Sequence, residues 1–269
     1  MLILLSVFFL AFVVPYLWIL PIHYISGLLN KKNNQISASP FRWGLRHFWI
    51  ISIIMIFSFI LVVLFYQYDN LFLGVEETNP INQDLADMSI LSMFGLALSC
   101  IFFIKKQDLE LFWGKIWSKK DSILKGIGYA FILKIGLFIY ARIFNISFDY
   151  NPGSYILSIN DEIISLINFY PPLLGFFLIV IPVPVYEEII FRGIILSGCE
   201  KRLKFIFANS IQALLFALLH QSLELLPYFF AFGMLAGHLR NTSQSLAPGI
   251  SMHVTNNFFA FIAILIMNR

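Results

Sequence analysis

Long apolar stretches, separated by short polar or charged segments, make up most of this chain. About 20 apolar residues cross the hydrocarbon core of a bilayer as one helix. Applied along the sequence, this length predicts spanning helices near residues 2–22, 47–67, 88–104, 124–144, 172–196, 205–220, 226–240 and 246–266. The pattern therefore predicts an all-α protein, a polytopic transmembrane helix bundle of about eight spans.

Composition agrees with this pattern and excludes a soluble domain. Of the 269 residues, 59% are hydrophobic and only 12% are charged, and the mean hydropathy is +0.82. The net charge of +3 is small, and the basic residues gather between apolar runs, which indicates membrane topology and no nucleic-acid partner. Cys100 and Cys199 lie in or beside apolar spans, so we interpret both as packing residues. We expect residues 1–269 to form a single membrane domain within the lipid bilayer.

The loops between predicted spans alternate in charge, which predicts their sides of the membrane. Basic residues follow the first, third and fifth spans: Lys31, Lys32, Arg42 and Arg46; Lys105, Lys106, Lys115, Lys119 and Lys120; Lys201, Arg202 and Lys204. Loops rich in lysine and arginine are cytoplasmic under the positive-inside rule. We therefore expect a multi-pass cell-membrane protein with its N-terminus and, given an even number of spans, its C-terminus outside.

Three charged residues interrupt the fifth apolar stretch: Glu187, Glu188 and Arg192. Ionisable groups inside a membrane-length segment are costly unless they are paired or hydrated, so they indicate a functional site. In a helix Glu188 and Arg192 share a face, whereas Glu187 is turned about 100° away. The sequence predicts that Arg192 neutralises Glu188 and that Glu187 stays available for chemistry.

Two prolines, Pro182 and Pro184, stand just before these carboxylates. Because proline lacks an N–H and clashes with the preceding turn, we expect the fifth span to kink or break there. A broken helix lining a wet cavity is the hypothesis that this supports.

Further polar groups gather in the last spans. His220 ends the apolar run Phe216-Ala217-Leu218-Leu219-His220, and His253 and Asn257 stand four apart on one helix face. Each alone is equally explained by packing or by hydrogen bonds between helices. Together with a carboxylate they supply a general base, a water-orienting partner and an oxyanion-stabilising pair, which is what peptide-bond hydrolysis requires.

The segments EEIIFRG, FALLH and HVTNN resemble, in this order, the motifs EExxxR, FxxxH and HxxxN of the CPBP family. This family comprises type II CAAX prenyl endopeptidases and bacteriocin-processing or immunity (Abi) proteins. The resemblance covers about residues 172–265, which we take as the catalytic core, whereas the first 170 residues match only in being hydrophobic. The pattern GxxxG at Gly233 and Gly237 is explained by close helix packing.

The resemblance implies an intramembrane endopeptidase, of glutamate or metallo type, acting on a peptide or protein substrate, a membrane-associated one included. It implies that Glu187 and His220 activate the attacking water, that His253 and Asn257 stabilise the oxyanion, and that Glu188 and Arg192 form a supporting ion pair. No cofactor is favoured. Zinc stays an alternative, with Glu187, His220 and His253 as its ligands.

Other readings of the same residues stay open. The chain could be a non-catalytic immunity or partner-binding protein of this family, or a transporter with a midplane ion site. One conflict also stands. Along straight helices, Glu187 and His220 would differ in depth by about 10–15 Å, so a shared site requires tilt, the proline kink or different span boundaries.

Overall fold

The computed structural model describes residues 43–50, 53, 112–114, 116–146, 172–220 and 222–267. Throughout these ranges the regular secondary structure is helical. This confirms the prediction of a helical membrane bundle. The spans predicted near 2–22 and 88–104, nearly all of 47–67, and Cys100 lie outside the described residues.

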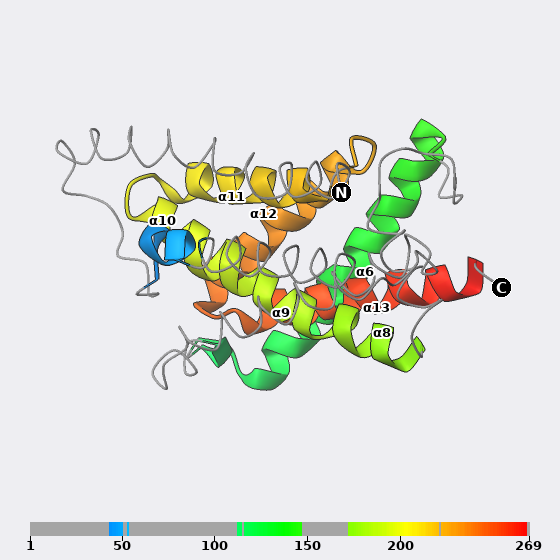
Figure 1. Cartoon of the computed structure of the whole chain (residues 1–269), viewed down its shortest axis with the longest axis horizontal. Helices are drawn as coiled ribbons and strands as arrows, with labels where there is room; N and C mark the ends of the chain where they lie inside the picture. The colour runs from blue at the N-terminus through cyan, green and yellow to red at the C-terminus, as the bar shows by residue number, and fades with distance from the viewer. Residues whose placement is uncertain are drawn as a thin grey trace, which may run out of the picture.

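Eight helical segments follow one another in the described part from residue 119 onward (Figure 1). They are α6 (Lys119–Phe144), α8 (Pro172–Val180), α9 (Pro182–Glu188), the π-helical turn η2 (Ile189–Ile195), α10 (Leu196–Glu200), α11 (Phe205–Leu219), α12 (Leu226–Ser243) and α13 (Ala247–Met267). In Figure 1, α8 and α9 run beside α13, α11 lies beside α12, and α6 crosses α13.

Three helices in the described ranges are long and apolar enough to cross a membrane: Lys119–Phe144, Pro172–Glu200 and Ala247–Ile266. The predicted spans 205–220 and 226–240 are helical but do not meet this test. α11 has 15 residues, about 22 Å of helix, which is shorter than the hydrocarbon core of about 30 Å. The chain is a membrane protein, whereas the number of about eight spans and the outside location of both termini stay predictions.

The fifth predicted span is broken where the prolines lie. α8 ends at Val180, Ile181 forms a turn, and α9 begins at Pro182, which confirms the expected break. The helix then widens into the π-helical turn η2 directly after Glu188, a feature frequent at functional sites.

This segment also continues to Glu200, beyond the predicted end at 196. The predicted end is wrong because Glu200 looks like a loop residue in the sequence but is buried against Arg240 of α12. Arg240 Nη1 lies 2.7 Å from Glu200 Oε2, and its Nη2 donates to Ser197 Oγ at 2.6 Å. A charge compensated in this way can remain inside the helix bundle.

The α11–α12 hairpin is packed closely through glycines. A Cβ on Gly233 would lie 2.7 Å from Ala213 Cα, and a Cβ on Gly237 would meet the side chain of Asn209. The Gln212 side chain donates to the carbonyl of Gly233 at 2.8 Å and Asn209 to that of Met234 at 2.9 Å. These contacts confirm the interpretation of the GxxxG pattern as a helix-packing site.

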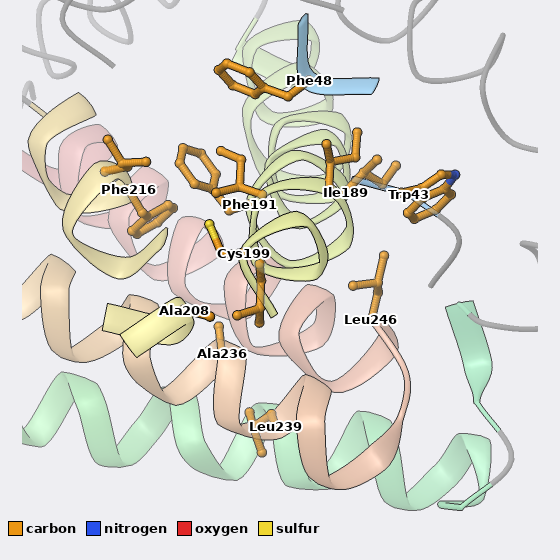
Figure 2. Close-up of a cluster of buried hydrophobic side chains, with 14 of the residues drawn as sticks. Trp43, Phe48, Ile189, Phe191, Cys199, Ala208, Phe216, Ala236, Leu239 and Leu246 are labelled. Atoms are coloured by element: carbon orange, nitrogen blue, oxygen red, sulfur yellow. The ribbon is translucent and has the colours of Figure 1, made fainter. Parts of the chain in front are cut away.

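A buried hydrophobic cluster joins the hairpin to the η2–α10 segment. Figure 2 shows Phe191, Phe216, Ala236 and Leu246 among its members, coming from η2, α11, α12 and the turn before α13. Cys199 is also within it and 2% exposed, which agrees with its interpretation as a packing residue. The elements that carry the charged residues are therefore held against the elements that carry the histidines.

Replacing Gly233 with alanine should destabilise the bundle. The added Cβ would meet the Ala213 backbone at 2.7 Å, so we expect the free energy of unfolding to fall by about 1–3 kcal/mol, measured by denaturation in detergent micelles. The matched control is Gly136→Ala on α6, where a Cβ has nothing within 4 Å. There the better helix propensity of alanine should leave stability unchanged or raise it by up to about 1 kcal/mol. Equal effects of the two substitutions would contradict the close packing of α11 on α12.

Candidate active site

Two carboxylates at the end of α9 and one arginine in η2 follow the break in this helix. Glu188 Oε1 lies 2.8 Å from Arg192 Nη1, and both side chains are fully buried. The distance is that of an ion pair, although the N–H is not aligned for a hydrogen bond. The guanidinium also lies over the ring of Phe216, with Cζ 4.5 Å from the centroid, so its charge is shared between a carboxylate and an aromatic face.

His253 of α13 lies between the two carboxylates. Its Nδ1 is 3.2 Å from Glu188 Oε1, and its Nε2 is 3.4 Å from Glu187 Oε2. Gly249, one turn earlier on α13, permits this approach, because a Cβ there would lie only 2.6 Å from Glu188 Oε2. Glu188 thus contacts both Arg192 and His253, an interaction between helices that the spacing along one helix does not predict.

The two carboxylates differ in environment. The Glu188 side chain is 0% exposed, whereas that of Glu187 is 22% exposed. Glu187 Oε2 is itself buried and has no hydrogen-bond partner among the described residues. Two carboxylates face Arg192 and His253, so the group is electrically neutral when His253 is protonated or when one carboxylate is. A site of this kind can exchange a proton without leaving a large net charge in the membrane.

His220 lies at the end of α11, where its backbone closes the helix. Its ring stacks on Phe229 with centroids 3.8 Å apart, and its Nδ1 is 2.8 Å from the Phe216 carbonyl oxygen. A carbonyl only accepts hydrogen bonds, so Nδ1 carries the hydrogen. In the neutral ring the lone pair is therefore on Nε2, which can accept a proton.

The ring of Phe216 brings the two histidines into one cluster. Its centroid is 4.5 Å from the His220 ring and 5.7 Å from the His253 ring. His220 is therefore one aromatic ring away from the group formed by His253 and the carboxylates. Phe216 is the first residue of the segment FALLH, and it serves here as the packing centre of the site.

The expected difference in depth between Glu187 and His220 comes from the wrong span boundary. The helix before the turn at 201–204 extends to Glu200, and α11 starts at Phe205. Along these helices Glu187 and His220 both lie about 20 Å from that turn. The two residues can therefore approach the same level on neighbouring helices, and the shared contacts around Phe216 are the result.

Asn257 shares a face of α13 with His253, and its Nδ2 donates to the carbonyl of Ile179 in α8 at 3.1 Å. Its Oδ1 accepts from Asn256 Nδ2 at 3.2 Å, and Asn256 Oδ1 accepts from the hydroxyl of Tyr228 at 2.6 Å.

The sequence indicated Asn256 only as one of the polar groups of the last spans, without a role, and sequence reasoning missed Tyr228 and Gly249 as residues of this region. The proximity of Asn256 to Asn257 was the only local signal for any of them.

The zinc alternative requires Glu187, His220 and His253 to converge on one point. Within the part of the chain that the structure describes, no group of three His, Cys, Asp or Glu side chains is arranged to hold a metal ion. His220 instead stacks on Phe229 and directs Nδ1 to a backbone carbonyl. This arrangement does not fit a three-ligand zinc site.

Comparison with known proteins finds similarity over the part of the chain that holds the three segments. Residues 169–259 match the family described as Type II CAAX prenyl endopeptidase Rce1-like. The chain is also similar to a membrane-embedded CAAX protease, MroQ, of Staphylococcus aureus, with 28% identity over 142 residues. That alignment covers 51% of this chain and 55% of the relative. No solved structure is significantly similar to the chain.

Replacing Arg192 with methionine should strongly destabilise the protein, because it leaves Glu188 buried with only His253 to compensate its charge. Removal of one partner of a buried pair typically costs about 3–5 kcal/mol, to be measured by denaturation in detergent micelles. Arg142→Met, at an exposed position of α6, is the matched control and should change stability by less than about 0.5 kcal/mol.

Adding Glu188→Gln to Arg192→Met should recover part of that loss, because the unpaired charge is removed. The contrary result is that Glu188→Gln destabilises the Arg192→Met protein as much as it destabilises the native protein. In that case the ion pair would not be the source of the stability.

Proposed function

We propose that this chain is an intramembrane endopeptidase. The premise is that residues 169–259 are a domain of the Rce1-like type II CAAX prenyl endopeptidase family, within the CPBP group. The observation that carries the proposal is the position of the His253 ring between the carboxylates of Glu187 and Glu188 in a membrane-length segment. Paired charges of this kind are costly in a bilayer and are explained by chemistry that uses them.

Glu187 is the proposed general base. Its side chain is the more accessible of the two carboxylates, and its Oε2 has no hydrogen-bond partner among the described residues. It takes a proton from water as the water oxygen attacks the peptide carbonyl carbon, and the carbonyl oxygen becomes an oxyanion. The proton then passes to the leaving amine as the C–N bond breaks, which gives a carboxylic acid and an amine.

Glu188 and Arg192 act through His253. The contact from Glu188 Oε1 to His253 Nδ1 fixes the orientation of the imidazole, so that Nε2 faces Glu187. The Nε2–Oε2 separation of 3.4 Å is long for a hydrogen bond, so a water or substrate oxygen can take the place of this contact. In that position a protonated His253 ring, with Nδ1–H on Glu188, would donate Nε2–H to the oxyanion, and one N–H of Asn257 is the proposed second donor.

His220 has a supporting role in this proposal. Its Nδ1 is held by the Phe216 carbonyl, which leaves Nε2 as the acceptor that orients the attacking water. The proposed substrate is a membrane-associated peptide or protein. The chemistry requires no metal ion, since the described residues supply base, donors and water-orienting group from side chains alone.

The first test compares peptides released from membranes that carry the native chain with those from membranes that carry Glu187→Gln. The substitution keeps the size of the side chain and removes the base, so we expect loss of the cleavage products, a decrease in rate of about 100-fold or more. The control is Glu224→Gln, at an exposed position before α12, which should cleave as the native chain does.

Unchanged products from correctly inserted Glu187→Gln would overturn the assignment of the base. If neither protein released a product but Glu187→Gln still removed a biological effect of the chain, the alternative of a non-catalytic immunity or partner-binding protein would be supported.

A second test concerns the metal. Because the described side chains do not converge as zinc ligands, we expect 1,10-phenanthroline to leave the cleavage rate of the purified protein within about twofold of its starting value. A non-chelating isomer of the same compound controls for effects on the detergent micelle. Loss of activity with the chelator alone, restored by added zinc, would favour the metallopeptidase alternative.

A further inference from the structure

A series of side-chain hydrogen bonds runs from α12 through α13 to α8. The Tyr228 hydroxyl donates to Asn256 Oδ1 at 2.6 Å, Asn256 Nδ2 donates to Asn257 Oδ1 at 3.2 Å, and Asn257 Nδ2 donates to the Ile179 carbonyl at 3.1 Å. Tyr228 and Asn256 are each 8% exposed. Polar groups buried to this extent are costly unless their hydrogen bonds are made.

The last acceptor fixes the direction of the whole series. A backbone carbonyl can only accept, so Asn257 must present its NH₂ group to Ile179 and its Oδ1 to Asn256. Asn256 must then present its own NH₂ group to Asn257 and its Oδ1 to Tyr228. Reversal of either amide would place two donors or two acceptors against each other, so only one orientation of the two side chains satisfies all three contacts.

The series ends at the break that precedes the carboxylates. Pro182 and Pro184 lack N–H groups, so the carbonyls four residues before each of them lose their helical donors. Ile179 lies between those two positions, and its carbonyl accepts the hydrogen bond from Asn257 Nδ2.

We infer that Tyr228 and Asn256 are positioning residues that hold the Asn257 amide in one orientation at the broken helix. One hydrogen of Asn257 Nδ2 is bound by Ile179, so the direction of the second is fixed. Under the function proposed above, on which this inference rests, that second hydrogen meets the oxyanion. Tyr228 acts only through Asn257 and does not touch the substrate.

The test is a double-substitution cycle on Tyr228 and Asn257. Tyr228→Phe removes one oxygen and keeps the ring that packs on Phe229. With a peptide identified by the Glu187→Gln comparison, we expect kcat to fall about 10-fold and KM to stay within twofold, because only the transition state uses the oriented donor. Asn257→Ala should lower kcat about 100-fold, and Tyr228→Phe added to it should have no further effect.

The matched control is Tyr140→Phe. The Tyr140 hydroxyl also donates to an oxygen of another segment, the Glu224 carbonyl at 2.9 Å, but it is outside the series. This variant should keep the native kcat and KM. A normal kcat for Tyr228→Phe, a loss shared equally by Tyr140→Phe, or a further loss in the Asn257→Ala background would each overturn the positioning role.

Thermal unfolding in detergent separates this inference from the proposed function. Tyr228→Phe should lower Tm by about 2–4 °C, and its effect should disappear in the Asn257→Ala background, whereas that of Tyr140→Phe should add to it. Additive effects of Tyr228→Phe and Asn257→Ala would refute the hydrogen-bonded series whatever the activity. If the effects on Tm were non-additive but the protein cleaved no peptide, the hydrogen-bonded series would be supported as a structural link only. The peptidase function and the catalytic use of the series would then both be refuted.

Discussion

The buried ion pair between Glu188 and Arg192 is the constraint on which the rest of the site depends. Two fully buried charges in a membrane-length helix must be compensated on every side. The compensation comes from two other helices: the ring of Phe216 on α11 and the imidazole of His253 on α13, which Gly249 allows to approach the carboxylate closely. His253 therefore both compensates the buried charge of Glu188 and is proposed to take part in the chemistry.

The two neighbouring carboxylates of α9 both contact one imidazole. A regular helix directs neighbouring carboxylates about 100° apart, yet Glu187 and Glu188 contact opposite nitrogens of one imidazole. The turn at Ile181 and the π-helical turn after Glu188 lie on either side of this pair. Glu188 itself keeps regular helical backbone angles, with φ −63° and ψ −37°, so the two carboxylates reach His253 from different directions around α9.

The local features of the site could be predicted from the sequence. A spacing of four places Glu188 beside Arg192, the prolines break the helix, and GxxxG packs α12 on α11, because each depends only on residues of one segment. The end of the fifth span could not be predicted in this way, since Glu200 is neutralised by Arg240 from a distant helix. Contacts of Glu188 with His253 and of Asn257 with Ile179 likewise depend on how helices approach, which no periodicity encodes.

The two buried polar systems around α13 have different physical designs. The cluster of Glu187, Glu188, Arg192 and His253 holds charges that can be redistributed by moving one proton, whereas the Tyr228–Asn256–Asn257 series consists of neutral groups whose orientation has one solution. Hydrolysis needs both properties, a base that can change charge and a donor whose direction is set before the oxyanion forms. Because α13 carries both His253 and Asn257, one helix would set the distance between the two proposed oxyanion donors.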